Sequence, residues 1–136
     1  MKYRKIEGYK YQLYETEVIS TPIIPEKEIT TEFLYIGLNG QLVIKRWYAW
    51  DGPSGPTIDT TAFIKASLAH DALYQLMRLG LLPKHHFSPA NRFLRDQCIQ
   101  FGMSKFRAWY IFQSVEMFGK SNIMSRPEDK NPVIEI

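Results

Sequence analysis

A histidine and an aspartate occupy consecutive positions in the segment AHDALY, residues 69–74. An imidazole beside a carboxylate offers one general base and one ligand for a hard cation such as Ca²⁺. A Gly/Pro-rich segment, WDGPSGP at residues 50–56, precedes it and is expected to expose backbone carbonyls. Together the two segments predict a small hydrolytic site, or equally a polar cluster that joins a loop to a helix.

His70 is predicted to face the protein interior. It belongs to a stripe of residues spaced three, four, three and four apart: Phe63, Ala66, His70, Leu73 and Met77. Asp71 lies about 100° further round the helix, at the edge of the apolar surface, and Tyr74 follows His70 by one turn. We therefore assign His70 as a candidate base with Tyr74 as a supporting phenol. A core histidine satisfied by its neighbours is the alternative, and the pattern alone favours it because structural polar clusters outnumber catalytic ones.

A second helix supplies the candidate partner for His70. Its apolar face consists of Ala90, Phe93, Leu94, Gln97, Cys98 and Phe101. Asn91 flanks that face and is predicted to reach into a cleft, whereas Asp96 points nearly opposite, toward solvent. A histidine base needs a group that fixes its tautomer through the other ring nitrogen. We include Asn91 among the candidate catalytic residues on this ground, although an amide orients a base only weakly.

The loop at residues 51–59 is a candidate Ca²⁺ site. Carbonyls near Gly52 and Gly55, with Asp71, would supply oxygen ligands to the cation. The other loop residues of interest are Trp50, Asp51, Pro53, Ser54 and Asp59. In a purely structural alternative, Trp50 and the prolines seat the strand end on the helices while the two carboxylates cap backbone amides.

The elements that must position these groups fall into two halves. Residues 1–50 are rich in Tyr, Ile, Val and Thr and are predicted to form mainly strands. Asn39 and Gly40 predict a two-residue turn of the primed type between strands at 32–38 and 41–48. Residues 60–120 are predicted to form three helices. The first is capped by Asp59 or Thr60 and ends at Gly80.

The second predicted helix begins at Ser88, with Pro89 at its first position, and ends at Gly102. The third extends from a Ser104 cap to Gly119, and residues 121–136 are expected to form a polar tail. The fold class is therefore α+β: one domain of residues 1–136 in which a small antiparallel sheet, built on an N-terminal hairpin, packs on three C-terminal helices.

The third helix is predicted to carry an interaction surface. A buried stripe is expected at Ala108, Ile111, Phe112, Val115 and Phe118. Trp109 and Tyr110 lie away from this stripe, so the pattern predicts an exposed aromatic pair. Lys105 and Arg107 are expected to be exposed beside them.

Composition limits the classes of function. The 136 residues carry 17 Lys and Arg against 14 acids, and the net charge of +3 gives no clear nucleic-acid signal. Apolar stretches are interrupted before the roughly 18 residues that a membrane span needs. The basic start has no apolar signal core, so we expect no signal peptide. The single cysteine, Cys98, excludes an internal disulfide and a cysteine-cluster zinc site.

The segment from Trp47 to Gly119 resembles a family of small tailed-phage and prophage proteins of unknown function. The resemblance rests on WDGPSGP, TIDT, HDALY, SPANRFLRD and the closing MFG. It implies a phage origin. Family members typically have ADRLFRD in the second helix, so their aspartate is replaced here by Asn91.

The HDxxY pattern also resembles the catalytic helix of phospholipase A2, more distantly. This likeness implies that His70 activates water, that Asp71 binds Ca²⁺ with carbonyls near Gly52 and Gly55, and that Tyr74 supports the base. The aspartate that orients the histidine in that family would fall near Asn91.

Three functions remain open. The first is a phage accessory protein of the virion or lysis module, with a hydrolase-like pocket acting on an ester or amide of the host envelope. The second is a non-catalytic component of the tail or baseplate that contacts other virion proteins. The third is a protein that binds a host factor through its third helix. The expected location is the virion or the host cytoplasm.

Overall fold

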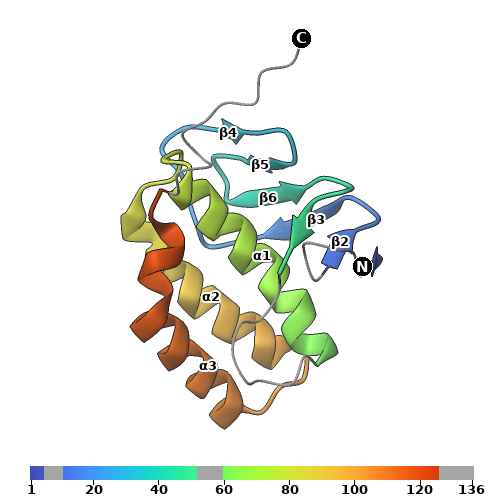
Figure 1. The fold of residues 1–136 in the computed structure, drawn as a ribbon, viewed down its shortest axis with the longest axis vertical. Helices are drawn as coiled ribbons and strands as arrows, with labels where there is room; N and C mark the ends of the chain where they lie inside the picture. The colour runs from blue at the N-terminus through green and yellow to red at the C-terminus, as the bar shows by residue number, and fades with distance from the viewer. Residues whose placement is uncertain (5–10, 52–59, 126–136) are drawn as a thin grey trace.

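The computed structural model describes residues 1–4, 11–51 and 60–125, and in these ranges two antiparallel sheets lie beside three α-helices (Figure 1). The helices are α1 (Thr61–Arg78), α2 (Phe87–Gln100) and α3 (Lys105–Phe118). Short 3-10 helices, η1 (Lys84–His86) and η2 (Gly119–Ile123), precede α2 and follow α3. The predicted α+β class, with sheets from the N-terminal half and three C-terminal helices, is confirmed.

The strands form two small sheets where a single hairpin-based sheet was predicted. The first has the order β1-β2-β7 and consists of β1 (Tyr3–Arg4), β2 (Tyr11–Leu13) and β7 (Ala49–Trp50). The second has the order β3-β6-β5-β4 and consists of β3 (Glu17–Ser20), β4 (Ile29–Thr30), β5 (Leu34–Ile36) and β6 (Gln41–Ile44). All pairings are antiparallel, and Ile36 lies opposite Leu42 across the central hairpin.

Helix α1 is the central element of the fold. It contacts β6 and β7 on one side and α2 on the other, and α3 then packs against α2 (Figure 1). Twelve of its eighteen residues are buried, including the whole predicted stripe. Small side chains at Ala66, Ala69 and Ala72 are fully buried, which lets neighbouring elements approach the helix closely. A helix that is apolar on two sides fits this central position.

The helix ends follow the capping residues in the sequence. The Thr60 hydroxyl accepts a hydrogen bond from the amide of Phe63, and the Ser104 hydroxyl accepts one from the amide of Arg107. Gly80 and Gly102 adopt positive φ after α1 and α2. Helix α2 begins at Phe87, directly after η1, so Pro89 is the third helical residue instead of the first. It still lies in the first turn, where a missing N–H costs no intrahelical bond.

The central hairpin turn differs from the predicted primed type. Asn39 keeps a negative φ, and only Gly40, at +81°, is left-handed. The Gly40 amide donates to the Gly37 carbonyl and the Gly37 amide to the Gln41 carbonyl, both at 3.0 Å. The turn is thus centred on Leu38 and Asn39 with Gly40 in the following position, an arrangement typical of a three-residue hairpin loop.

The strand predicted to extend from Gln41 to Tyr48 is broken after Ile44. Trp47 adopts φ +78°, which redirects the chain from the four-stranded to the three-stranded sheet. A non-glycine residue in this region costs about 1–3 kcal/mol, so its neighbours must hold it there. The Trp47 amide donates to the Leu13 carbonyl at 2.8 Å, and the Arg46 guanidinium lies 4.1 Å from the Trp47 ring.

The expected C-terminal tail starts later than residue 121. Residues 119–123 form η2, and Ile123 is buried in the core shared by α1 and the sheets. Residues 126–136 lie outside the described residues. The part of the expected tail that is described is therefore a packed element that joins the end of α3 to α1.

Cys98 lies in a second hydrophobic cluster between the helices, together with Phe63, Leu94 and Ile111. Burial raises the pKa of the Cys98 thiol to about 12, and Arg107 opposes this only in part. Since the thiolate is the nucleophilic form, the thiol is unreactive near neutral pH. Cys98 is a core residue, as the sequence predicted.

Candidate functional site

Three residues that the sequence singled out meet between α1 and α2. The Nε2 atom of His70 lies 2.7 Å from the Oδ1 atom of Asn91, and the Tyr74 hydroxyl donates to the same oxygen at 2.5 Å. The His70 and Tyr74 rings are 4.0 Å apart, as expected for side chains one helical turn apart. The predicted cluster of His70, Tyr74 and Asn91 is therefore present as a hydrogen-bonded group.

The cluster is buried. Asn91 is fully buried, and only 6% of the surface of His70 is exposed. Asn91 follows Ala90, whose small side chain is also completely buried at the contact between α1 and α2. Polar groups at such a depth are stable only when their hydrogen bonds are made, because an unmade bond costs about 1–3 kcal/mol.

Glu116 on α3 completes the group, and the sequence analysis missed it. Its Oε1 atom accepts a hydrogen bond from Nδ2 of Asn91 at 3.2 Å, and its Oε2 atom accepts one from the Ser88 hydroxyl at 3.0 Å. The one signal available in the sequence was that Glu116 is the only acid between residues 102 and 125. It adjoins the buried stripe of α3 and is itself half-buried.

These contacts determine the tautomer of His70. A carboxylate only accepts hydrogen bonds, so the Asn91 amide must present its NH₂ group to Glu116 and its carbonyl oxygen to His70. A carbonyl oxygen also only accepts, so Nε2 of His70 carries the hydrogen. In the neutral ring, Nδ1 is then the basic nitrogen.

Asp71 lies on the Nδ1 side of His70. Its Oδ1 atom is 3.8 Å from Nδ1, which is within ion-pair range and beyond hydrogen-bond range. The Asp71 side chain is 26% exposed whereas Asn91, on the Nε2 side, is fully buried, so the group beside Nδ1 is the one nearer to solvent.

Tyr74 is held as a hydrogen-bond donor. Burial raises the pKa of its phenol far above the ordinary value. The hydrogen bond with Asn91 opposes this rise, and the charges of Glu116 and Asp71 add to it. The ring stacks on Phe87 with a centroid separation of 5.6 Å. Gly119 lies against the other end: a Cβ there would come within 2.5 Å of the phenol oxygen, so a larger residue would displace the hydroxyl from Asn91.

Of the predicted loop residues, the structure describes Trp50, at the end of β7, and Asp51. Trp50 is buried, and its indole N–H donates to the Ser67 hydroxyl of α1 at 3.1 Å, which seats the strand end on the helix. Asp51 is exposed. Gly52, Pro53, Ser54, Gly55 and Asp59 lie outside the described residues. Of the predicted Ca²⁺ ligands only Asp71 is described, and no group of three His, Cys, Asp or Glu side chains with metal-site geometry occurs in the described ranges.

On α3 the predicted exposed aromatic pair is confirmed, since Trp109 and Tyr110 are each more than half exposed. Lys105 is also exposed, whereas Arg107 is half-buried. The prediction that Phe118 belongs to the buried stripe is wrong: 73% of its surface is exposed. Phe118 is the last residue of the helix, and the chain continues into η2 there without placing anything over the ring.

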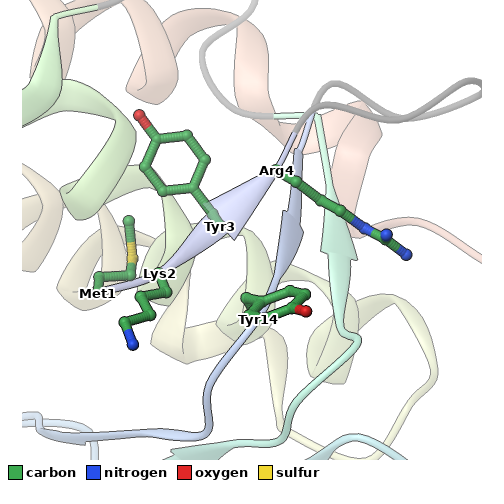
Figure 2. A pocket seen from close by; sticks show the side chains of 5 residues that line it. All are labelled: Met1, Lys2, Tyr3, Arg4 and Tyr14. Atoms are coloured by element: carbon green, nitrogen blue, oxygen red, sulfur yellow. The ribbon is translucent and has the colours of Figure 1, made fainter.

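A hollow of about 410 Å³ lies at the N-terminal strand, away from the predicted residues. It is lined by Met1, Lys2, Tyr3, Arg4 and Tyr14. Figure 2 shows Tyr3 and Arg4 pointing to opposite sides of β1, as consecutive strand residues do. Its lining lacks a histidine or a carboxylate, so it holds none of the residue types on which the predicted hydrolytic site was based.

Comparisons with protein-family models, curated proteins and solved structures give no match for this chain. Among the helices of the described ranges, none has the length and apolar character that crossing a bilayer requires.

Replacing Asn91 by aspartate tests the hydrogen-bond assignment. In the Asn91→Asp variant the acceptor facing His70 and Tyr74 is kept, but a carboxylate replaces the NH₂ group 3.2 Å from Glu116. Like charges at this distance repel, so the free energy of unfolding should fall. Adding Glu116→Gln places an amide donor against the new carboxylate. The double variant should then be about 0.5–3 kcal/mol more stable than the sum of the two single effects predicts, as measured by chemical denaturation in a double-mutant cycle. Additive effects of the two substitutions would show that the groups do not interact.

Proposed function

We propose that this chain is a phage-encoded accessory protein of the virion or lysis module that hydrolyses an ester or amide of the host envelope, with His70 as general base. The observation that carries the proposal is the chain of contacts from Glu116 through Asn91, which leaves Nδ1 of His70 as the basic nitrogen beside Asp71. The phage origin rests on the resemblance of residues 47–119 to a phage family of unknown function, and the envelope substrate is part of the same proposal for a virion or lysis protein.

The arrangement supports water activation. Nδ1 of His70 takes a proton from water while the water oxygen forms a bond to the carbonyl carbon of the substrate. The tetrahedral intermediate then collapses with cleavage of the bond to the leaving group, and the imidazolium returns its proton to that group. Asp71 stabilises the imidazolium in between. Asn91 and Tyr74 contact the ring from the far side and keep it oriented.

Burial determines the direction of substrate approach. The Nε2 side of His70 is closed by Asn91 and Tyr74, behind which Glu116 lies. Substrate must therefore reach Nδ1 from the side of Asp71. The interior positions act as positioning residues, and only His70 and Asp71 lie where they would contact the reacting atoms.

Replacing His70 by glutamine separates catalysis from folding. A glutamine amide can still donate to Oδ1 of Asn91, but it cannot take up a proton from water. With p-nitrophenyl acetate as the probe ester, kcat should fall by about 100-fold to 10,000-fold, the usual contribution of a general base. The melting temperature should remain close to that of the original protein.

His85→Gln is the matched control, because it removes an exposed imidazole in η1. Its rate should be unchanged. Equal rates for His70→Gln and the unmodified protein, with both folded, would contradict the proposed base.

Calcium binding provides a separate test that does not require turnover. If Asp71 and the carbonyls near Gly52 and Gly55 hold Ca²⁺, as the sequence predicts, the cation binds only the folded chain. It then adds about 2.7 kcal/mol to the free energy of unfolding at 100 times Kd, and the melting temperature must rise. Asp71→Asn should abolish this increase, while Asp96→Asn, on an exposed carboxylate of α2, should not. Thermal unfolding with and without Ca²⁺ measures the effect. Identical calcium responses of the two variants would remove the proposed ligand.

The burial of His70 favours a second candidate, a non-catalytic component of the phage tail or baseplate. In that role the group around Asn91 only holds three helices together, and the indole of Trp50 fixes the end of β7 to α1. Mass spectrometry of purified phage particles is the direct check: the protein should be present in stoichiometric amount, and its absence from every particle would exclude this role.

A further inference from the structure

The outer face of α3 is apolar and aromatic. Phe106, Trp109, Tyr110 and Met117 are each more than half exposed, and their spacing of three, four and eleven residues from Phe106 places them on one side of the helix. The Phe106 and Trp109 rings are 6.2 Å apart, so they form a continuous surface. The opposite side, with Ala108 and Ile111, is buried against α2. Helix α3 is thus apolar on two sides, and the rest of the described chain covers only one of them (Figure 1).

The exposed charges that α3 and its flanking residues contribute to this face are positive. Lys105 at the start of α3 and Lys120 just after its end are exposed, and Arg107 is half-buried between them. Between residues 102 and 125 the only acid is Glu116, and its carboxylate accepts hydrogen bonds from Ser88 and Asn91 toward the protein interior. An apolar strip bordered by cations therefore forms the outer surface of α3.

The same charges disfavour a second copy of the chain as the partner. In a two-fold dimer through α3, either Lys105 would meet Lys120 of the other copy or each lysine would meet its own equivalent, depending on helix direction. The only acid of the segment is already engaged with Ser88 and Asn91. Such a dimer would place cations beside cations without neutralisation.

We propose that the outer face of α3 docks on a bilayer surface that contains anionic lipid, with Phe106, Trp109, Tyr110 and Met117 in the headgroup region and Lys105 and Lys120 at the phosphates. Trp and Tyr favour this region because their rings are apolar and their N–H and O–H groups stay hydrated. The face is convex, on a helix packed from one side only, so it inserts into a soft surface without needing a complementary groove. The docking does not depend on whether His70 is catalytic.

Vesicle sedimentation tests the docking with two lipid compositions. The full chain should bind mixed vesicles that contain phosphatidylglycerol and phosphatidylcholine in a 1:1 ratio. It should bind much more weakly to vesicles of pure phosphatidylcholine, or to the mixed vesicles at raised salt. The Phe106→Ser/Trp109→Ser variant should bind the mixed vesicles roughly tenfold more weakly or worse. Both side chains are exposed, so the variant should stay folded, which circular dichroism verifies.

A matched control removes apolar surface elsewhere. Val18 and Ile24 are exposed to the same extent, 54% each, and belong to the sheet half of the chain. Val18→Ser/Ile24→Ser should leave vesicle binding unchanged.

Three outcomes would overturn the proposal. The first is no binding to the mixed vesicles. The second is equal binding by the two double variants. The third is that the chain self-associates through α3, or binds an acidic protein there, but does not bind the vesicles.

Discussion

The hydrogen bond from the Asn91 amide to the Glu116 carboxylate is the interaction on which the interpretation of the site depends. An amide alone can present either its oxygen or its nitrogen to a histidine, and the two orientations give opposite tautomers. Because a carboxylate can only accept, Glu116 leaves a single arrangement, in which the carbonyl oxygen of Asn91 accepts from both His70 and Tyr74. In many proteins a carboxylate orients a histidine by direct contact. Here the carboxylate of Glu116 contacts Asn91 instead, and it orients His70 indirectly by fixing which way the Asn91 amide points.

Three helices contribute side chains to this group, so the site forms only when α1, α2 and α3 are packed together. Helix α1 provides His70, Asp71 and Tyr74, α2 provides Asn91, and α3 reaches the group only through Glu116. The fully buried alanines at the contacts of α1 allow the polar atoms to approach to hydrogen-bond distance. A displacement of α3 would leave the Asn91 amide without its acceptor, and the orientation of His70 would no longer be defined. The stability of the fold and the chemistry of the site are therefore linked through the same contacts.

The sequence was sufficient for whatever depends on periodicity within one element. The stripe of α1 predicted that His70 faces inward with Tyr74 beside it, and the caps at Thr60 and Ser104 predicted two helix starts. It was insufficient where a contact depends on which helices meet. The role of Glu116 becomes visible only when α3 packs on α2. In the same way, no residue pattern around Trp47 predicts its positive φ. The primed turn was wrong for a related reason: Asn39 tolerates a positive φ, but its side chain instead accepts from the Gln41 amide, with only Gly40 left-handed.

The two sides of α3 call for different explanations. Ala108 and Ile111 stabilise the fold, since burying apolar surface contributes about 25 cal/mol per Å². Phe106, Trp109 and Met117 remain largely in contact with water and gain little of that stabilisation. Helix formation does not require Phe106 and Trp109 either, because aromatic residues are weaker helix formers than Ala, Leu or Lys. Folding therefore accounts for the inner side of the helix and not for the outer one. A cluster of large apolar side chains bordered by lysines is the kind of surface that binding to an anionic bilayer requires. The reason for these side chains is therefore sought in binding and not in folding.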